Sequence, residues 1–431
     1  MIGKKPKLRR AVSLFTLIMY GVGIILGAGV YALIGSAAGM TGNSLWLSFL
    51  LAAIVSSFTG LSYAELTSMF PKSAAEYYYV KNAVRSRLLA FLVGWIEVFA
   101  DLVAASAVAL GFAGYFSALF GGSPVLIALG LIFALSIVNF WGIKESTTLN
   151  VIFSAIEVFG LLTIIALAIP NFGSVNYTEL THGFSGVFSA AALIFFAYIG
   201  FEDLANIAEE TKSPKKNLPK ALLASVVITT VIYILVAISA VSLADWHELA
   251  ASSAPLALAA SKSMGSNAFL FLSLIALFAT GNTVLILLIV GSRQIYGMGM
   301  DNVLPKFLSR VHKKTRTPWI AVFFVMLVAV AFIFFEQISI VASFTDFGTF
   351  AVFIFVNSAV IILRYKKPKM KRRFRIPINI GNLPILPVLG LISTILLSLH
   401  LEPIVLIYGL VIFIAGVPVF YILNRKGKIK I

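Results

Sequence analysis

Residues 21–29 read Gly-Val-Gly-Ile-Ile-Leu-Gly-Ala-Gly and lie in the middle of the first long apolar stretch of the chain. Four glycines in nine residues predict a helix that is interrupted here, because glycine destabilises the interior of a helix. In hydrocarbon, an unpaired backbone N–H or C=O group costs several kcal/mol, so an interruption is tolerated only where it lines a cavity enclosed by protein. This segment is therefore a candidate ligand site.

The composition is that of an integral membrane protein. Of the 431 residues, 60% are hydrophobic and only 12% are charged, whereas soluble domains are roughly one half apolar and one quarter charged. Apolar runs long enough to cross a bilayer as helices recur along the whole chain, and the alternating pattern of a membrane β-barrel is missing. We predict an all-α fold with twelve transmembrane helices, near residues 12–38, 45–69, 88–119, 125–142, 149–169, 187–207, 220–243, 268–299, 318–335, 339–363, 384–400 and 404–423.

The net charge of +16 comes from lysines and arginines that fall in short loops between the predicted spans. This distribution differs from the basic face of a soluble nucleic-acid-binding protein, so no nucleic-acid partner is expected. If the N-terminus is cytoplasmic, all of these residues except Lys262 lie on the cytoplasmic side. The positive-inside rule then predicts an even number of spans, with both termini in the cytoplasm and the protein in the cell membrane.

Several classes of site are disfavoured by the residue types present. The chain has no cysteine, which excludes disulfides and thiolate chemistry. Its four histidines fall in loops or at the end of a predicted helix, and no phosphate-binding loop of a primary pump occurs. We therefore expect no catalytic residues, no metal site and no cofactor, and a membrane-embedded enzyme is disfavoured.

A second interruption is predicted at residues 195–203, where Phe-Phe-Ala-Tyr-Ile-Gly-Phe-Glu-Asp breaks the sixth span. The two interrupted spans are five apart, and because five is odd they cross the membrane in opposite directions, as in the inverted repeats of secondary transporters. We predict one transporter domain over residues 1–431, with repeats at about 11–170 and 184–363 and two added helices at about 384–423. The alternative is that the glycines only allow helices to pack closely.

The ends of half-helices explain what such a pair of interruptions can bind. Free N–H groups at the start of a half-helix attract anions, and free carbonyl groups at the end of another attract cations. A zwitterion fits between them. We expect its carboxylate on the amides of Gly27, Ala28 and Gly29, and its ammonium group near the carbonyls of Ile25, Phe196, Ala197 and Ile199.

Several motifs in order resemble the amino acid–polyamine–organocation (APC) transporter superfamily. They are Gly27-Ala28-Gly29-Val30-Tyr31, Tyr63-Ala64-Glu65-Leu66 before Pro71, Phe195 to Glu202 continued by Ala208 to Pro214, and Ser292 to Met298. The resemblance implies a LeuT-type fold of two inverted five-helix repeats, alternating access, and an amino acid or related amine as the substrate. It also implies that Ile25, Gly27, Ala28, Gly29, Phe196, Ala197 and Ile199 hold the substrate backbone, with Phe196 over the side chain.

The chain departs from the family pattern at one loop. Residues 73–76 read Ser-Ala-Ala-Glu, where members of the family often carry paired glycines after the proline. Glu202 matches the acidic residue that the family places just past the second interruption, and we expect it to serve ion coupling or gating.

Acidic residues inside predicted spans each need a physical reason, because a carboxylate near the bilayer centre costs about 2.5 to 3.5 kcal/mol. The resemblance places Glu157 where sodium-coupled relatives hold an ion and some proton-coupled members have a lysine. Glu157 therefore either couples transport to protons or only supports the interrupted helix. Asp101 shares a helix face with Glu97 and either selects a basic substrate side chain, shares the proton, or makes a polar contact between helices. Tyr198 and the polar cluster Thr280-Gly281-Asn282-Thr283 either line the cavity or make ordinary packing bonds. If they line it, we expect Tyr198 to contact the substrate and Thr280 and Thr283 to serve ion coupling or gating.

The leading interpretation is a secondary active transporter of amino acids driven by protons, with sodium as an alternative ion and membrane lipid as the surrounding solvent. The alternatives are an ion-independent exchanger of amino acids or polyamines, and a non-transporting amino acid sensor on the same fold. The sequence leaves the substrate side chain and the oligomeric state open.

Overall fold

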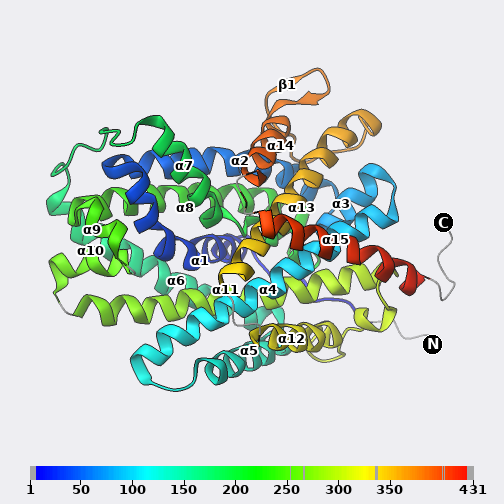
Figure 1. Ribbon diagram of the computed structural model, residues 1–431. Helices are drawn as coiled ribbons and strands as arrows, with labels where there is room; N and C mark the ends of the chain where they lie inside the picture. Colours follow the sequence, from blue (N-terminus) through cyan, green and yellow to red (C-terminus); the bar gives the residue numbers. More distant parts are fainter. Residues whose placement is uncertain are drawn as a thin grey trace.

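The computed structural model describes residues 6–252, 254–265, 267–334, 338–399, 401 and 403–424, and almost all of them are helical (Figure 1). One small departure from the all-α prediction is a hairpin of two short antiparallel strands, β1 (Asn379–Ile380) and β2 (Leu383–Pro384). Gly381 makes its turn with a φ of +60°, in the left-handed region that favours glycine. The hairpin lies in a loop between two helices, so it does not alter the fold class.

A helix occupies each of the twelve predicted stretches. Nine helical stretches in the described part of the chain are long and apolar enough to cross a membrane. The helices concerned are α1 (Leu14–Thr41), α2 (Leu45–Met69), α4 (Arg87–Phe120), α5 (Pro124–Trp141), α6 (Ile143–Ala168), α8 (Pro214–Leu243), α11 (Asn267–Met300), α13 (Ile338–Lys366) and α15 (Pro403–Asn424). Three shorter apolar helices fill the remaining stretches: α7 (Gly183–Phe195), α12 (Trp319–Ile333) and α14 (Ile385–Ser398).

Short helices between these long ones are not predicted by the sequence. They are α3 (Ala75–Val84), α9 (Trp246–Ala251), α10 (Pro255–Met264), η1 (Gly42–Ser44), η2 (Ile169–Asn171) and η5 (Lys306–Ser309). Their lengths of three to ten residues are too short for a hydropathy pattern to reveal. Local capping defines some of them, as where the Asp245 carboxylate accepts the His247 N–H at the start of α9.

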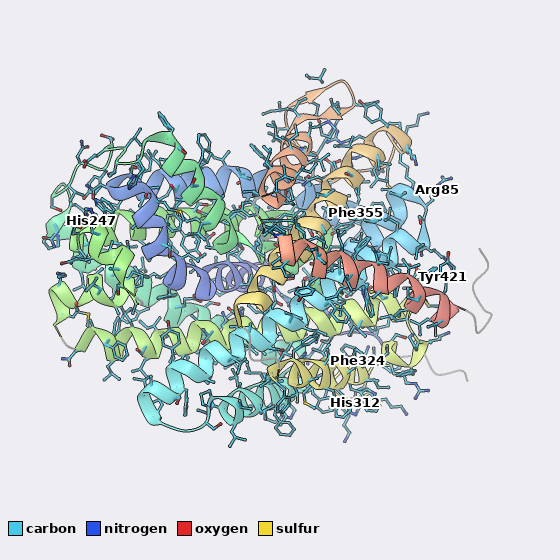
Figure 2. All side chains as sticks on the ribbon, in the orientation of Figure 1. Arg85, His247, His312, Phe324, Phe355 and Tyr421 are labelled. Atoms are coloured by element: carbon cyan, nitrogen blue, oxygen red, sulfur yellow. The ribbon has the colours of Figure 1, made fainter. Side chains whose placement is uncertain are left out.

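The two ends of the helical bundle differ. Arg85 and His312 lie at one end and His247 lies at the other (Figure 2). We call the first the basic end, because Arg85, Lys212 and the loop from Arg310 to Arg316 follow or precede the long helices there. Helices α9 and α10 cover the opposite end (Figure 1).

Helix α1 runs through the middle of the bundle (Figure 1) and packs against α6, α7, α8 and α11. Its side chains Leu17, Tyr20, Leu26 and Val30 are fully buried. The outer helices α5, α12 and α15 instead expose large apolar side chains, as expected of surfaces that face lipid. An interruption in α1 is therefore enclosed by protein.

Two buried ion-pair groups connect helices toward the basic end. The Arg293 guanidinium donates to both carboxylate oxygens of Glu210, at 2.9 and 3.0 Å. The Glu65 carboxylate accepts from Arg364 at 2.6 Å and from Arg372 at 2.9 Å. Each charge in these two groups thus has an opposite partner, which offsets the cost of removing it from water.

Candidate functional site

The first interruption is confined to one of the four glycines. Gly27 has a φ of 14° and a ψ of −162°, which are not helical values, whereas the rest of α1 continues as a helix. Gly21 and Gly23 serve close packing instead, because a Cβ atom on them would clash with the hydroxyl oxygens of Ser225 and Ser154 respectively. Gly27 thus interrupts the helix, whereas Gly21 and Gly23 allow neighbouring helices to pack closely, so each interpretation holds for different glycines.

The second interruption follows the predicted position. Helix α7 ends at Phe195, a short turn η3 covers Phe196–Tyr198, and a 3₁₀ segment η4 covers Phe201–Glu210. Gly200 lies between them with a φ of +115°, which strongly favours glycine. Ordinary i→i−4 pairing is therefore lost here, and backbone groups become available to a ligand or a neighbouring side chain.

The two interruptions meet in the middle of the bundle. A Cβ atom on Gly29 would lie 3.1 Å from the Ala197 Cα, so the two backbones are close to van der Waals contact. One turn away, a Cβ atom on Gly200 would lie 2.8 Å from the Ile24 side chain. Glycine at both positions therefore allows the two chain segments to approach each other.

Tyr233 of α8 joins both interruptions. Its hydroxyl oxygen lies 2.5 Å from the carbonyl oxygen of Ile25, 3.2 Å from that of Leu26 and 3.0 Å from that of Ala197. A tyrosine hydroxyl has one proton and donates it to one acceptor at a time. Three carbonyl oxygens thus converge on a single buried donor.

This arrangement changes the environment expected for the substrate ammonium group. Two of the carbonyls assigned to it, those of Ile25 and Ala197, face the Tyr233 hydroxyl in the structure. Tyr233 was not predicted from the sequence, because it is a single polar side chain within the apolar run Val-Ile-Tyr-Ile-Leu. A hydroxyl in the middle of an otherwise apolar span was the available signal.

Polar side chains of α6 and α11 hold the first half of α1. The Asn150 side chain donates to the Asn282 oxygen at 2.8 Å, and Asn282 donates in turn to the Ser154 hydroxyl at 3.1 Å and the Gly23 carbonyl at 3.4 Å. All three side chains are buried. Asn282 was expected only as part of a polar cluster. Asn150 and Ser154 were not predicted, although two polar residues four positions apart lie on the same face of a helix and could have indicated a shared contact.

The two predicted threonines of α11 differ in position. Thr283 adjoins the first interruption, since a Cβ atom on Gly27 would lie 3.1 Å from its hydroxyl oxygen. Thr280 is buried and donates to the Ala276 carbonyl at 2.7 Å, within its own helix. Thr283 is therefore the one of the two that the structure brings to the interruption.

Glu157 of α6 is completely buried, and neither of its oxygens has a hydrogen-bond partner among the described residues. The hydroxyl of Tyr31 is also buried and unpartnered within that part of the chain. Tyr31 and Tyr233 both lie close enough to Glu157 to interact with it electrostatically. A buried carboxyl group without a donor is satisfied by a proton or a cation.

A carboxylate triad lies past the second interruption, toward the basic end. It consists of Glu97 and Asp101 of α4 and Asp203 of η4, and one oxygen from each lies within 4.8 Å of the others. All three side chains are buried. Oxygen atoms at this spacing suit a proton or a metal cation, and the expectation of no metal site stays a prediction.

The triad gives Asp101 a neighbour that was not predicted from the sequence. Asp101 was expected beside Glu97, but the approach of Asp203 was not foreseen. Glu202 makes a contact of its own: its Oε2 accepts the N–H of Gly200 at 2.9 Å, which stabilises the interruption. Its expected part in ion coupling or gating stays a prediction.

Three predicted substrate contacts differ in their surroundings. The Tyr198 hydroxyl donates to the Phe49 carbonyl of α2 at 3.2 Å, a hydrogen bond between helices. Its contact with substrate stays a prediction. Ile199 is partly buried. The side chains of Ala28 and Phe196 lie outside the part of the chain that the structure describes.

The loop that departs from the family pattern is connected to the second interrupted helix. Ala74 has a φ of 57°, and the Ala75 N–H donates to the Asn206 oxygen at 2.9 Å. The Asn206 amide donates to Glu76 at 3.1 Å. Burial raises the pKa of Glu76 from 4.5 to about 7, so a titratable group lies where α3 contacts η4.

Sequence comparisons find similar proteins over nearly the whole chain. Residues 12–423 match the family model described as amino acid permease. A branched-chain amino acid permease of Bacillus subtilis is 31% identical, covering 98% of this chain and 94% of its own length. The methylthioribose transporter of that bacterium is 30% identical, covering 99% and 96%. A vacuolar cationic amino acid transporter of Arabidopsis thaliana is 32% identical, covering 84% of this chain and 61% of its own length.

Proposed function

Since the chain belongs to the amino acid permease family, whose members are membrane transporters and not enzymes, we propose that it carries an amino acid across the cell membrane by alternating access. The observation that carries this proposal is the meeting of the two interrupted helices at Gly29, Ala197 and Tyr233. Freed backbone groups enclosed by protein at the middle of a helical bundle are suited to a polar substrate.

We also propose a LeuT-type architecture. All twelve apolar helices would cross the membrane, with α1 to α6 and α7 to α13 as inverted repeats and α14 and α15 added. The two interrupted spans are five apart, and this odd offset supports the arrangement, because the two spans then cross the membrane in opposite directions. The position of lysines and arginines supports cytoplasmic termini, because positive loops stay on the cytoplasmic side.

The substrate is proposed to be a zwitterionic amino acid held by its backbone. Its carboxylate would lie on the amides that follow Gly27, and its ammonium group near carbonyls at the two interruptions. The relatives are named for branched-chain amino acids, cationic amino acids and methylthioribose. Branched-chain and cationic amino acids share the zwitterionic backbone and differ in the side chain, so the backbone is the part of the substrate that we specify. Methylthioribose is a sugar and lacks this backbone.

Glu157 is the proposed proton-coupling residue. It is buried on α6, which packs against α1, and has no hydrogen-bond donor among the described residues. A protonated Glu157 would be able to donate a hydrogen bond to a carbonyl group freed at the interruption, which an ionised one cannot do. Protonation would thus favour the conformation that binds substrate, so that proton and substrate are carried together. The carboxylate triad would provide a second proton-accepting group between the substrate and the basic end.

Transport by purified protein in proteoliposomes tests the proposal. Vesicles without internal amino acid should accumulate leucine or arginine when the outside is made acidic, and a sodium gradient alone should have no effect. If uptake occurs only when amino acid is supplied inside, the protein is an exchanger and the proton-coupling proposal is wrong.

A thermal-shift screen against amino acids and polyamines complements the flux measurement. Ligand binding raises apparent stability by mass action. A shift without flux under any gradient would identify an amino acid sensor. No shift with any compound would contradict the proposed substrate class.

A further inference from the structure

A groove of about 1560 Å³ at the basic end is unrelated to the two interruptions. It is formed by the end of α11, by η5, by the loop from Arg310 to Arg316, by the start of α12 and by the segment around Lys7. We call it the basic groove. Its cationic lining residues are Lys7, Lys306, Arg310, Lys313, Lys314 and Arg316, and no acidic residue lines it within the described part of the chain.

The positive charge of the groove is uncompensated. Among the residues that the structure describes, none of these six side chains takes part in an ion pair. All are exposed except Arg316, which is partly buried. Six like charges around one groove repel one another unless an anion lies among them, so the groove is complementary to a negatively charged ligand.

The loop that forms one wall is held in place by specific bonds. The Arg316 Nε donates to the Lys7 carbonyl at 2.6 Å, which joins the N-terminal segment to this wall. The Thr317 hydroxyl donates to the Phe140 carbonyl at 3.0 Å, and the His312 ring lies 5.4 Å from that of Phe140. The groove is therefore a defined feature of the fold, built on the end of α5.

The apolar part of the groove indicates what kind of anion fits. Met300, Phe307 and Trp319 also line it, with 53%, 50% and 42% of their surface exposed. Trp319 begins α12, and Phe323 and Phe324 continue the exposed apolar surface along that helix. His312 and Phe324 lie toward the same corner of the molecule (Figure 2). The groove thus leads from a cluster of cations onto a face of α12 suited to acyl chains.

We infer that the basic groove binds the headgroup of an anionic phospholipid, whose acyl chains lie along α12. Lysine and arginine beside a membrane surface attract anionic headgroups, and tryptophan is favoured at the boundary between headgroups and hydrocarbon. The chain's own ends do not suit the groove, because Lys4, Lys5 and the last seven residues carry charge of the same sign.

Native mass spectrometry of the purified full-length protein tests this inference. The probes are phosphatidylglycerol and phosphatidylcholine with the same acyl chains. The test variant is Lys306→Gln/Arg310→Gln/Lys313→Gln/Lys314→Gln. The control variant, Lys366→Gln/Lys369→Gln/Lys371→Gln/Arg373→Gln, removes the same number of exposed charges from the last residue of α13 and the loop that follows it.

We expect phosphatidylglycerol to bind wild type and the control variant more tightly than phosphatidylcholine. The groove variant should bind phosphatidylglycerol at least about tenfold more weakly, because four attractive charges are removed. Equal loss in both variants, or equal binding of the two lipids, would overturn the inference. Thermal stabilisation by glycerol phosphate or inorganic phosphate to the same extent as by phosphatidylglycerol would also overturn it, since the ligand would then be a free anion. A thermal unfolding curve for each variant in detergent confirms that it is folded.

Discussion

The hydroxyl oxygen of Tyr233 lies 2.5 Å from the carbonyl oxygen of Ile25 and 3.0 Å from that of Ala197. One side chain of α8 therefore contacts both interrupted helices. Any movement that separates α1 from η3 has to break at least one of these contacts. Tyr233 is thus placed to couple the two half-sites, in addition to satisfying their carbonyl groups.

We predict that Tyr233→Phe lowers amino acid uptake at least about tenfold while the protein remains folded. The substitution removes one donor, and a buried acceptor left unpaired costs about 1 to 3 kcal/mol. Uptake in proteoliposomes and thermal unfolding in detergent measure the two effects. Tyr177→Phe is the matched control, because the Tyr177 hydroxyl forms a hydrogen bond with the Ser242 hydroxyl, far from the interruptions and near the end of the bundle opposite the basic end. Unchanged uptake by Tyr233→Phe would show that the hydroxyl serves packing only.

The positions of the long helices were predictable because each is a long apolar run. The sequence also predicted both interruptions, since a cluster of glycines or of polar residues weakens a helix within an apolar span. The sequence did not reveal which residues far apart in the chain contact each other. Tyr233 with Ile25, and Asp203 with Glu97 and Asp101, are separated by many residues, and hydropathy contains no information on which faces meet.

The glycine run shows a further limit of sequence reasoning. Four glycines were treated as one interruption, but only Gly27 leaves the helical conformation. Gly23 faces Ser154 and Gly21 faces Ser225. Both roles require a missing side chain, so composition alone does not distinguish them.

The approach of Gly29 to Ala197 leads to a second prediction. A Cβ atom on Gly29 would lie 3.1 Å from the Ala197 Cα, so Gly29→Ala should separate the interruptions by a few tenths of an ångström and Gly29→Val by more. Overpacking of this kind costs about 1 to 3 kcal/mol. We expect uptake to fall in the order wild type, Ala variant, Val variant. Gly111→Ala is the control, because a Cβ atom there meets nothing within 4 Å. Full activity of Gly29→Val would mean that this contact is not needed for transport.

The unpartnered Glu157 carboxyl group leads to a third prediction. In Glu157→Gln, substrate binding measured by thermal shift should persist, because glutamine keeps the size and polarity of the side chain. Uptake should lose its dependence on an imposed pH gradient, since the amide does not titrate. Glu145→Gln on the same helix is exposed and should behave as wild type. A retained pH profile in Glu157→Gln would assign the residue a structural role.

The buried pair Arg293–Glu210 supports a prediction about stability. Both side chains are fully buried, and the guanidinium donates to both carboxylate oxygens. Removing one member leaves an uncompensated buried charge, at a cost of about 3 to 5 kcal/mol. Arg293→Met should therefore lower the melting temperature strongly. The double variant Arg293→Met/Glu210→Met should be more stable than Arg293→Met alone, and additive losses in the double variant would contradict the ion-pair interpretation.

The last prediction concerns the pH dependence of stability through Glu76, which lies on α3, outside the long apolar helices. Burial raises its pKa from 4.5 to about 7, so the folded protein holds this proton more tightly than the unfolded chain does. Its contribution to stability is therefore full below about pH 4.5 and is lost as the pH rises to about 7. A difference of this size corresponds to ~3 kcal/mol.

Thermal unfolding between pH 4.5 and 8 measures this contribution. Glu76→Gln does not titrate, and its side-chain oxygen keeps an acceptor for the Asn206 amide. The variant should therefore gain stability relative to wild type as the pH rises, with the largest gain above pH 7. Glu145→Gln, on an exposed site, should follow the wild-type profile. If the difference between Glu76→Gln and wild type does not change with pH, Glu76 is not the group that titrates. Protonation of Glu76 would also act on η4, the segment that carries Asp203, because Asn206 of η4 donates a hydrogen bond to the Glu76 carboxyl group.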